Sequence, residues 1–176
     1  MPRIPAAASV CAALAASGFA HAQASLPTPG GEVFIIDQRA QRAYDEVGFA
    51  PARRAGDVLY VSGVIVARRE NESNDVAAFR VQARRAFERL DQHLRAAGLT
   101  FDNVAMINSF HVWESPHFAG SRDQQIEVLN ELRREFIHGP HPAWTAIGTT
   151  GLLVERGIVE IQLIAHYPPQ TPLQSR

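Results

Sequence analysis

The sequence contains no lysine, so all 17 of its basic side chains are arginine. This absence excludes a lysine Schiff base and the attachment of pyridoxal phosphate through lysine. Cysteine is almost absent too, because the single residue, Cys11, lies near the start of the chain. Once that segment is removed, the chain has neither a disulfide nor a thiol nucleophile to offer.

A strong charge of one sign is also lacking. The formal net charge is -1 and no basic block occurs, which argues against nucleic acid as a partner. His138 and His141 lie three positions apart in a loop with prolines, but no HExxH or repeated ligand pair accompanies them. We therefore interpret these histidines as solvated loop residues and predict no metal site, with zinc or copper binding as the alternative.

The first residues resemble a secretory signal. Arg3 supplies a positive charge, residues 6–20 form a short alanine-rich apolar run, and residues 20–22 and 22–24 fit small-x-small cleavage patterns. The run is too short to span a membrane. We predict that residues 1–24 are a cleaved signal peptide and that the protein is exported to the periplasm, with no membrane attachment after cleavage. A helical or disordered N-terminus that is retained in the cytosol is the alternative.

The remaining chain is long enough for one domain with its own core. Residues 25–32 are rich in proline and glycine and predict a flexible linker, residues 33–170 form the domain, and residues 171–176 form a tail. Residues 39–47 are ambiguous, and a strand at 48–54 would be broken by Pro51. Hydrophobic periodicity, with Asp75 and Ser121 as helix caps, predicts strands at 33–36, 58–66, 102–113, 145–149 and 158–166, and helices at 76–97 and 121–137.

This order predicts an α+β sandwich, in which a mainly antiparallel mixed sheet carries two helices on one face. The last strand places Glu160, Gln162 and His166 on the face opposite Ile161 and Leu163. A carboxylate among apolar neighbours can have a raised pKa and act as a general acid or base through a water molecule. An ion pair at a subunit interface, or a solvent-facing edge, is the alternative that the strand alone favours.

Three stretches together resemble the reactive-intermediate deaminase family of RidA and YjgF type. They are VLYVSGVIV at 58–66, QARRAFERLDQHLRAAGLTFDNVAMINSFHV at 82–112, and HPAWTAIGTTGLLVERGIVEIQLIAHYP at 141–168. The resemblance implies a chorismate-mutase-like fold and a homotrimer with clefts between its subunits. It also implies hydrolytic deamination of enamines and imines such as 2-aminoacrylate, without a metal or organic cofactor.

The resemblance also implies site residues. Ser62 and Asn130 match ligand-binding positions, and Glu160 matches the glutamate thought to position the attacking water. Trp144 stands where the family has an arginine that holds the substrate carboxylate, next to Thr145 in the same binding segment. Phe49 stands at a position that is usually tyrosine. Arg156 is a candidate replacement by position alone.

Two functions remain open at this point. Loss of the arginine predicts an altered substrate range, in which Trp144 and Phe49 stack on a small uncharged or aromatic imine in a more apolar cleft. Alternatively, Trp144 fills the cleft, and the chain forms a non-catalytic small-molecule-binding or structural trimer.

Overall fold

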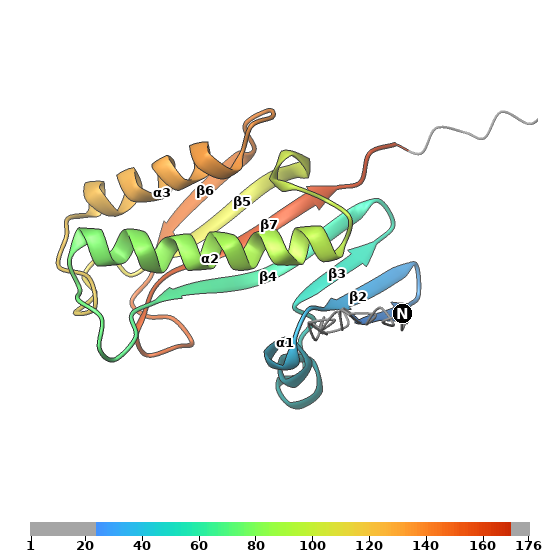
Figure 1. The fold of residues 1–176 in the computed structure, drawn as a ribbon, viewed down its shortest axis with the longest axis horizontal. Coiled ribbons are helices and arrows are strands. Elements are labelled where there is room, and N and C mark those ends of the chain that lie inside the picture. The colour runs from blue at the N-terminus through green and yellow to red at the C-terminus, as the bar shows by residue number, and fades with distance from the viewer. Residues whose placement is uncertain (1–23, 170–176) are drawn as a thin grey trace, which may run out of the picture.

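The computed structural model describes residues 24–169, which form one seven-stranded sheet and three α-helices (Figure 1). The strand order across the sheet is β1-β2-β3-β4-β7-β5-β6. The strands are β1 (Ala24–Thr28), β2 (Gly31–Ile35), β3 (Ala52–Ala55), β4 (Val58–Ala67), β5 (Val104–His111), β6 (Ala143–Gly148) and β7 (Gly157–His166). The helices are α1 (Gln38–Arg42), α2 (Val76–Ala96) and α3 (Arg122–Phe136).

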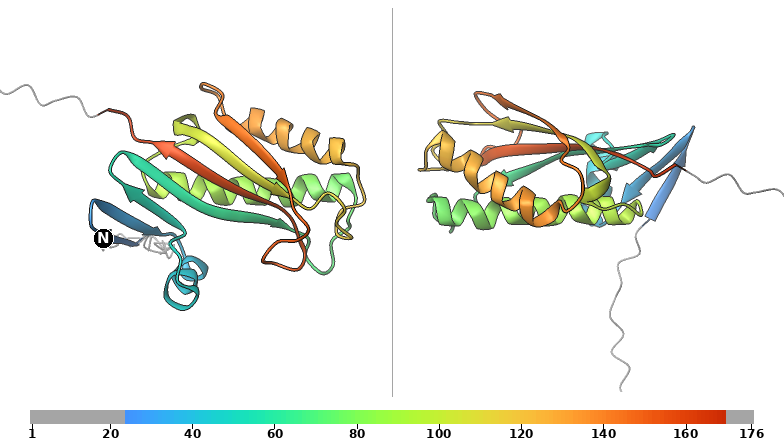
Figure 2. Two further views of the ribbon diagram at one scale, coloured as in Figure 1. Left: turned by 180° about the vertical axis from the view of Figure 1, so that it is seen from behind. Right: turned by 90° about the horizontal axis from the view of Figure 1, so that it is seen from above.

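Every strand pair is antiparallel except β5 and β6. Parallel neighbours need a crossover, and α3 supplies it between β5 and β6. The two long helices α2 and α3 cover one face of the sheet, and no element of residues 24–169 covers the other (Figure 2). The predicted α+β fold, with a mixed and mainly antiparallel sheet and two helices on one face, is thereby confirmed.

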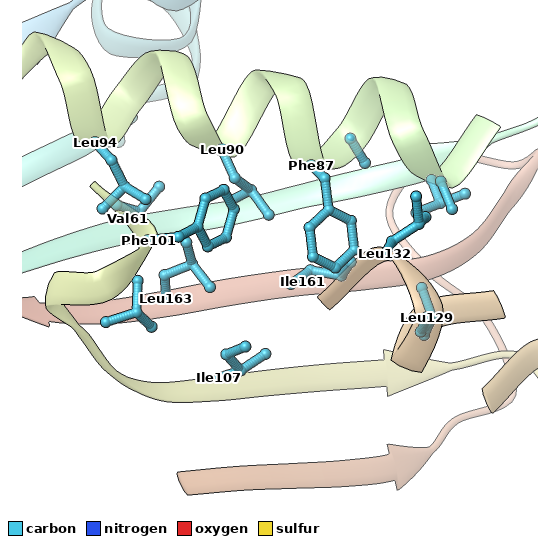
Figure 3. Close-up of a cluster of buried hydrophobic side chains, with 14 of the residues drawn as sticks. Val61, Phe87, Leu90, Leu94, Phe101, Ile107, Leu129, Leu132, Ile161 and Leu163 are labelled. Atoms are coloured by element: carbon cyan, nitrogen blue, oxygen red, sulfur yellow. The ribbon is translucent and has the colours of Figure 1, made fainter. Parts of the chain in front are cut away.

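The core lies between this sheet and the two long helices (Figure 3). Asp75 caps α2 as predicted, because its carboxylate accepts a hydrogen bond from the Ala78 amide at 2.8 Å. The apolar stripe of α2 packs against the inward side chains of β4, β5 and β7. Its buried members are Phe79, Ala83, Ala86, Phe87, Leu90 and Leu94.

Helix α3 begins at the predicted capping box, in which Ser121 and Gln124 satisfy each other's backbone amides. Its buried face includes a polar side chain. Ile126 is only half-buried, whereas Gln125 is fully buried beside Val128 and Leu129. A glutamine at a core position needs a polar partner, and that partner lies in the candidate site.

The flexible linker predicted at residues 25–32 is wrong, because β1 and β2 pair as an antiparallel hairpin across this segment. Gly30, with a φ of 73°, supplies the left-handed turn. Leu26 packs against a small cluster that contains Val33 and Ile35. The segment that the sequence left ambiguous is helical, with α1 followed by a π-helical turn over Ala43–Val47.

Candidate active site

A bulge in β4 shapes the open face of the sheet. The register of β4 against β7 shifts between Val61 and Val64, so Ser62 and Gly63 form a bulge in β4. The Ser62 amide donates to the Pro51 carbonyl at 3.0 Å. The Ser62 hydroxyl donates to the Ala50 carbonyl at 2.7 Å. Ser62 therefore fastens the segment before β3 to the bulge.

The carboxylate of Glu160 lies directly on the backbone of Gly63. A Cβ atom added to Gly63 would come within 1.8 Å of Glu160 Oε1, a separation that real atoms do not tolerate. Any side chain at this position would therefore have to displace the carboxylate of Glu160. We call Ser62, Gly63 and Glu160 the open-face cluster.

The carboxyl group of Glu160 is half-buried on the open face of the sheet. Its neighbours in register are Ile65 on β4 and Phe110 on β5. Burial raises the pKa of its carboxyl group, because these surroundings disfavour the charged form. Within residues 24–169 no arginine or histidine lies within ion-pair distance of Glu160. Its acceptor oxygens are therefore available to a water molecule or a ligand.

Trp144 lies on the opposite face of the sheet from Glu160. It pairs in register with Ile107, which is buried under the helices, whereas Glu160 pairs with Phe110 on the uncovered face. One protomer therefore does not bring these two predicted site residues together. Thr145, next along β6, is exposed and in register with Asn108. Phe49 is 42% exposed. It precedes Ala50, whose carbonyl oxygen accepts the hydrogen bond from the Ser62 hydroxyl.

A second cluster forms where α3 meets β6. The guanidinium carbon of Arg133 lies 4.4 Å from the ring centroid of Trp144. Arg133 Nη1 donates to Asn130 Oδ1 at 3.2 Å. We call Trp144, Asn130 and Arg133 the edge cluster. It unites two predicted residues with one, Arg133, that sequence reasoning missed.

A chain of buried polar groups is hydrogen-bonded to the indole nitrogen of Trp144. Trp144 Nε1 donates to Ser109 Oγ at 2.9 Å, and Ser109 Oγ lies 2.8 Å from His111 Nε2. His111 Nδ1 lies 2.6 Å from Gln125 Oε1, and an amide oxygen there requires the proton on Nδ1. His111 Nε2 then accepts from the Ser109 hydroxyl, so each group in the chain has a defined role. Burial lowers the pKa of His111, which favours this neutral form.

Two hollows adjoin the edge cluster. A space of only about 10 Å³, about the room of one water molecule, lies beneath Trp144 and is bordered by Ser109 and Arg133. A larger hollow of about 220 Å³ lies beside α3. Its lining consists of Asn130, Arg133, Arg134, Ile137 and His141.

The structure also locates the remaining candidates. Arg156 lies 3.9 Å from Glu70 in a loop contact. Its charge therefore already has a carboxylate partner. The backbone amides of His138 and Gly139 donate to Asp102, which fixes the loop before β6. Within residues 24–169 no group of three histidine, cysteine or acidic side chains is placed to hold a metal ion. None of the helices described there is long and apolar enough to cross a membrane.

The sequence contained a signal for the buried polar chain. Ser109 and His111 follow Ile107 on the inward face of β5, so two buried polar groups there require hydrogen-bond partners. That signal predicts a hydrogen-bonded pair but not its partners, because Trp144 and Gln125 come from β6 and α3. Arg133 gave no signal, since arginines on an exposed helix are ordinary.

Comparison with known proteins places this chain in a known family. A family model described as Endoribonuclease L-PSP matches residues 40–167. The chain therefore belongs to this family, the RidA and YjgF type that its sequence motifs resemble. Because the match spans nearly the whole of the described chain, both clusters lie inside it.

Two kinds of relative support this membership. The RutC family protein YjgH of Escherichia coli (strain K12) is 37% identical over 128 residues, which cover 72% of this chain and 88% of that protein. A solved structure of protein YJGH has a TM-score of 0.56 and 34% identity, covering 72% of this chain and 89% of that one. RidA from an Antarctic Psychrobacter has a TM-score of 0.53 and 25% identity over 68% of this chain and 88% of its own.

Proposed function

We propose that this chain is a hydrolytic deaminase of small imines or enamines, with a site shared between the subunits of a homotrimer and a substrate range altered by Trp144. One observation carries the proposal. Glu160 is a half-buried carboxyl group with a raised pKa, without an ion-pair partner in the described chain, and seated against a glycine that leaves it room. A carboxylate that served only the fold would be expected to have a cationic or hydrogen-bonding partner.

The chemistry follows from a carboxylate that takes and returns a proton. Glu160 accepts a proton from a water molecule, whose oxygen attacks the carbon of the C=N bond. Return of that proton to the nitrogen gives a neutral amino alcohol. Glu160 then accepts the proton of its hydroxyl group and passes it to the nitrogen, so that the C–N bond breaks, ammonia leaves and a carbonyl compound remains. An enamine enters the same sequence after it tautomerises to the imine. Neither an oxidant nor a reductant is consumed.

The positions of the two clusters support a shared site. The open-face cluster and the edge cluster lie on opposite faces of one sheet, so one protomer cannot present both to one small molecule. In a homotrimer, the uncovered sheet face of one copy can meet the β6 edge of the next. Ser62 and Glu160 of one subunit and Asn130 of its neighbour would then face one ligand. Sedimentation of the purified protein tests the assembly, and a monomer at working concentration would contradict it.

Replacement of Glu160 by glutamine tests the reaction. Glu160→Gln keeps the size of the side chain but cannot accept a proton, so we expect turnover to fall by about 100-fold or more. The assay follows ammonia release from imines that amino-acid oxidases generate from charged and aromatic amino acids. Glu127→Gln is the matched control, because Glu127 is an exposed carboxylate on α3. Equal rates in Glu160→Gln and wild type would remove Glu160 from the mechanism.

A second function, ligand binding without catalysis, is favoured by one feature of the edge cluster. Trp144 leaves only about 10 Å³ beneath it where the family has an arginine. Trp144→Arg separates the two functions. If 2-aminoacrylate hydrolysis appears or rises in this variant while Glu160 is intact, the reaction machinery is present and Trp144 sets its range. If no imine is hydrolysed by either form, the chain is a binding protein.

Export is a separate part of the proposal. The signal-like residues lie outside those that the structure describes, so the proposal rests on their sequence pattern. Sequencing the N-terminus of protein recovered from the periplasm is expected to begin near residue 23 or 25. Recovery of the intact chain from the cytosol would contradict export without bearing on the reaction.

A further inference from the structure

The charges of α3 are divided between two sides. Glu131 pairs with Arg80 and Glu135 pairs with Arg84, so these two carboxylates face α2. Arg133 and Arg134 border the hollow instead. Within residues 24–169 no carboxylate lies within ion-pair distance of either arginine. The hollow is therefore lined by cations whose charge the described chain leaves unbalanced.

The guanidinium of Arg133 is held in one orientation. Its Cζ atom lies 4.4 Å from the centroid of the Trp144 ring, and Nη1 donates to Asn130 Oδ1 at 3.2 Å. Its Nε atom is buried and has no hydrogen-bond partner in the described chain. Burial, with the nearby charge of Arg134, lowers the pKa of Arg133, although an arginine remains charged. A fixed cation with unused donors favours an anion.

The hollow itself limits the size of that anion. Its volume is about 220 Å³, below the range of drug-sized pockets, and its lining contributes two guanidiniums, an imidazole, an amide and one apolar side chain. No acidic residue is part of that lining. A small organic acid fits the charge and the size, and Ile137 offers its carbon skeleton an apolar contact.

We propose that this hollow binds the carboxylate of a small organic acid and that Arg133 is its anchor. The rigid planar fork of arginine matches a planar carboxylate with two parallel hydrogen bonds. Arg133 on α3 would thereby supply the positive charge that Trp144 on β6 does not carry. That the bound acid is the substrate of the enzyme rests on the proposed function. It replaces the expectation of an uncharged substrate with that of an imino acid.

Binding of pyruvate to the purified full chain tests the site without any reaction. Isothermal titration calorimetry is expected to show that wild type binds pyruvate and that Arg133→Gln binds it at least about tenfold more weakly. Arg122→Gln is the matched control, because Arg122 stacks over Trp113 at 4.8 Å but does not border the hollow. Arg133→Lys keeps the charge without the fork, so its affinity is expected to lie between wild type and Arg133→Gln.

Two further probes identify the group that is recognised. Methyl pyruvate is the neutral ester, and its binding is expected to be weaker than that of pyruvate and equal in wild type and Arg133→Gln. Inorganic phosphate is expected to compete less well than pyruvate. The proposal is overturned if wild type binds no pyruvate, if Arg133→Gln binds it unchanged, if the ester binds equally well, or if phosphate is preferred.

The test also separates this inference from the proposed reaction. The double variant Glu160→Gln with Arg133→Gln is expected to bind pyruvate about tenfold more weakly than Glu160→Gln alone, because Glu160 does not border the hollow. Pyruvate binding that needs Arg133, in a protein without imine hydrolysis, would leave the site standing and remove the reaction. Gel filtration of Arg133→Gln completes the test: loss of the oligomer with unchanged pyruvate affinity would show that Arg133 serves an interface, which also overturns the proposal.

Discussion

The two clusters carry opposite charges that the described chain leaves unpaired. Glu160 on the open face has no cation beside it, and Arg133 at the edge has no carboxylate beside it. Elsewhere, carboxylates such as Glu131 and Glu72 pair with arginines that join one element to another. These paired charges thus stabilise the fold, whereas the unpaired charges of Glu160 and Arg133 lie on the two surfaces where we place the chemistry.

The two clusters are also positioned by different means. The backbone positions Glu160, because the bulge at Gly63 leaves the space that its carboxylate occupies. Side chains position Arg133. Its guanidinium contacts the ring of Trp144, and Trp144 is in turn held by the buried hydrogen bonds of Ser109 and His111. Changes to the backbone and changes to the buried chain are therefore expected to affect different properties, and this expectation can be tested from the largest effect downward.

Gly63→Ala is expected to have the largest effect. The new Cβ would displace the Glu160 carboxylate, so imine turnover should fall by about 100-fold or more, with a loss of stability of about 1–3 kcal/mol from overpacking. Pyruvate binding should still depend on Arg133, because the edge cluster is untouched. Gly151→Ala is the control, since a Cβ there meets nothing within 4 Å. Full turnover in Gly63→Ala would show that the close approach does not matter for catalysis.

His93 gives the next largest effect and belongs to neither cluster. Burial on α2 lowers its pKa from 6.5 to about 4, with the charge of Arg89 acting in the same direction. The unfolded chain therefore binds this proton more readily, so stability is full above pH 6.5 and falls as the pH drops towards 4, by about 3 kcal/mol. Urea unfolding should show a smaller fall in His93→Leu than in wild type. His166→Gln, at an exposed position, should behave as wild type.

Ser109→Ala tests the buried chain that supports the edge cluster. It would leave Trp144 Nε1 and His111 Nε2 without a partner, which should cost about 2 kcal/mol or more. Because Trp144 would lose its anchor, pyruvate should also bind more weakly although Ser109 does not border the larger hollow. Ser109→Thr keeps the hydroxyl and should restore both properties. Loss of stability with unchanged pyruvate affinity would show that the buried hydrogen bonds do not support ligand binding at the edge cluster.

The difference in positioning also explains what the sequence could predict. The face of β7 that carries Glu160 followed from strict alternation along the strand, so a local pattern was enough to predict the position of this carboxylate. The edge cluster depends on which residue of α3 lies over which residue of β6. Local periodicity cannot supply that contact, because it is set by the packing of a helix on a sheet.

The same limit accounts for the errors in the fold. The β1–β2 hairpin was missed because proline and glycine at residues 25–32 are typical of both linkers and turns. The buried Gln125 was missed because a polar residue in a helix is ordinarily assigned to the surface. Its reason for being inside is His111, which lies 14 positions away on another element. Partners distant in sequence decide such positions.

The smallest expected effect is on stability and carries the opposite sign from the effect on activity. Because burial raises the pKa of Glu160, the folded chain holds that proton more tightly than the unfolded one. Its contribution to stability is therefore full below the ordinary value of 4.5 and declines as the pH rises through the raised pKa. At pH 7, Glu160→Gln should unfold at a slightly higher temperature than wild type, and the difference should vanish below pH 4.5. Glu127→Gln should show no such difference.

A Glu160→Gln variant that is less stable than wild type at pH 7 would mean that the carboxylate has a stabilising partner. That partner would come from a neighbouring subunit, and the open-face charge would then be part of an interface rather than of a reaction.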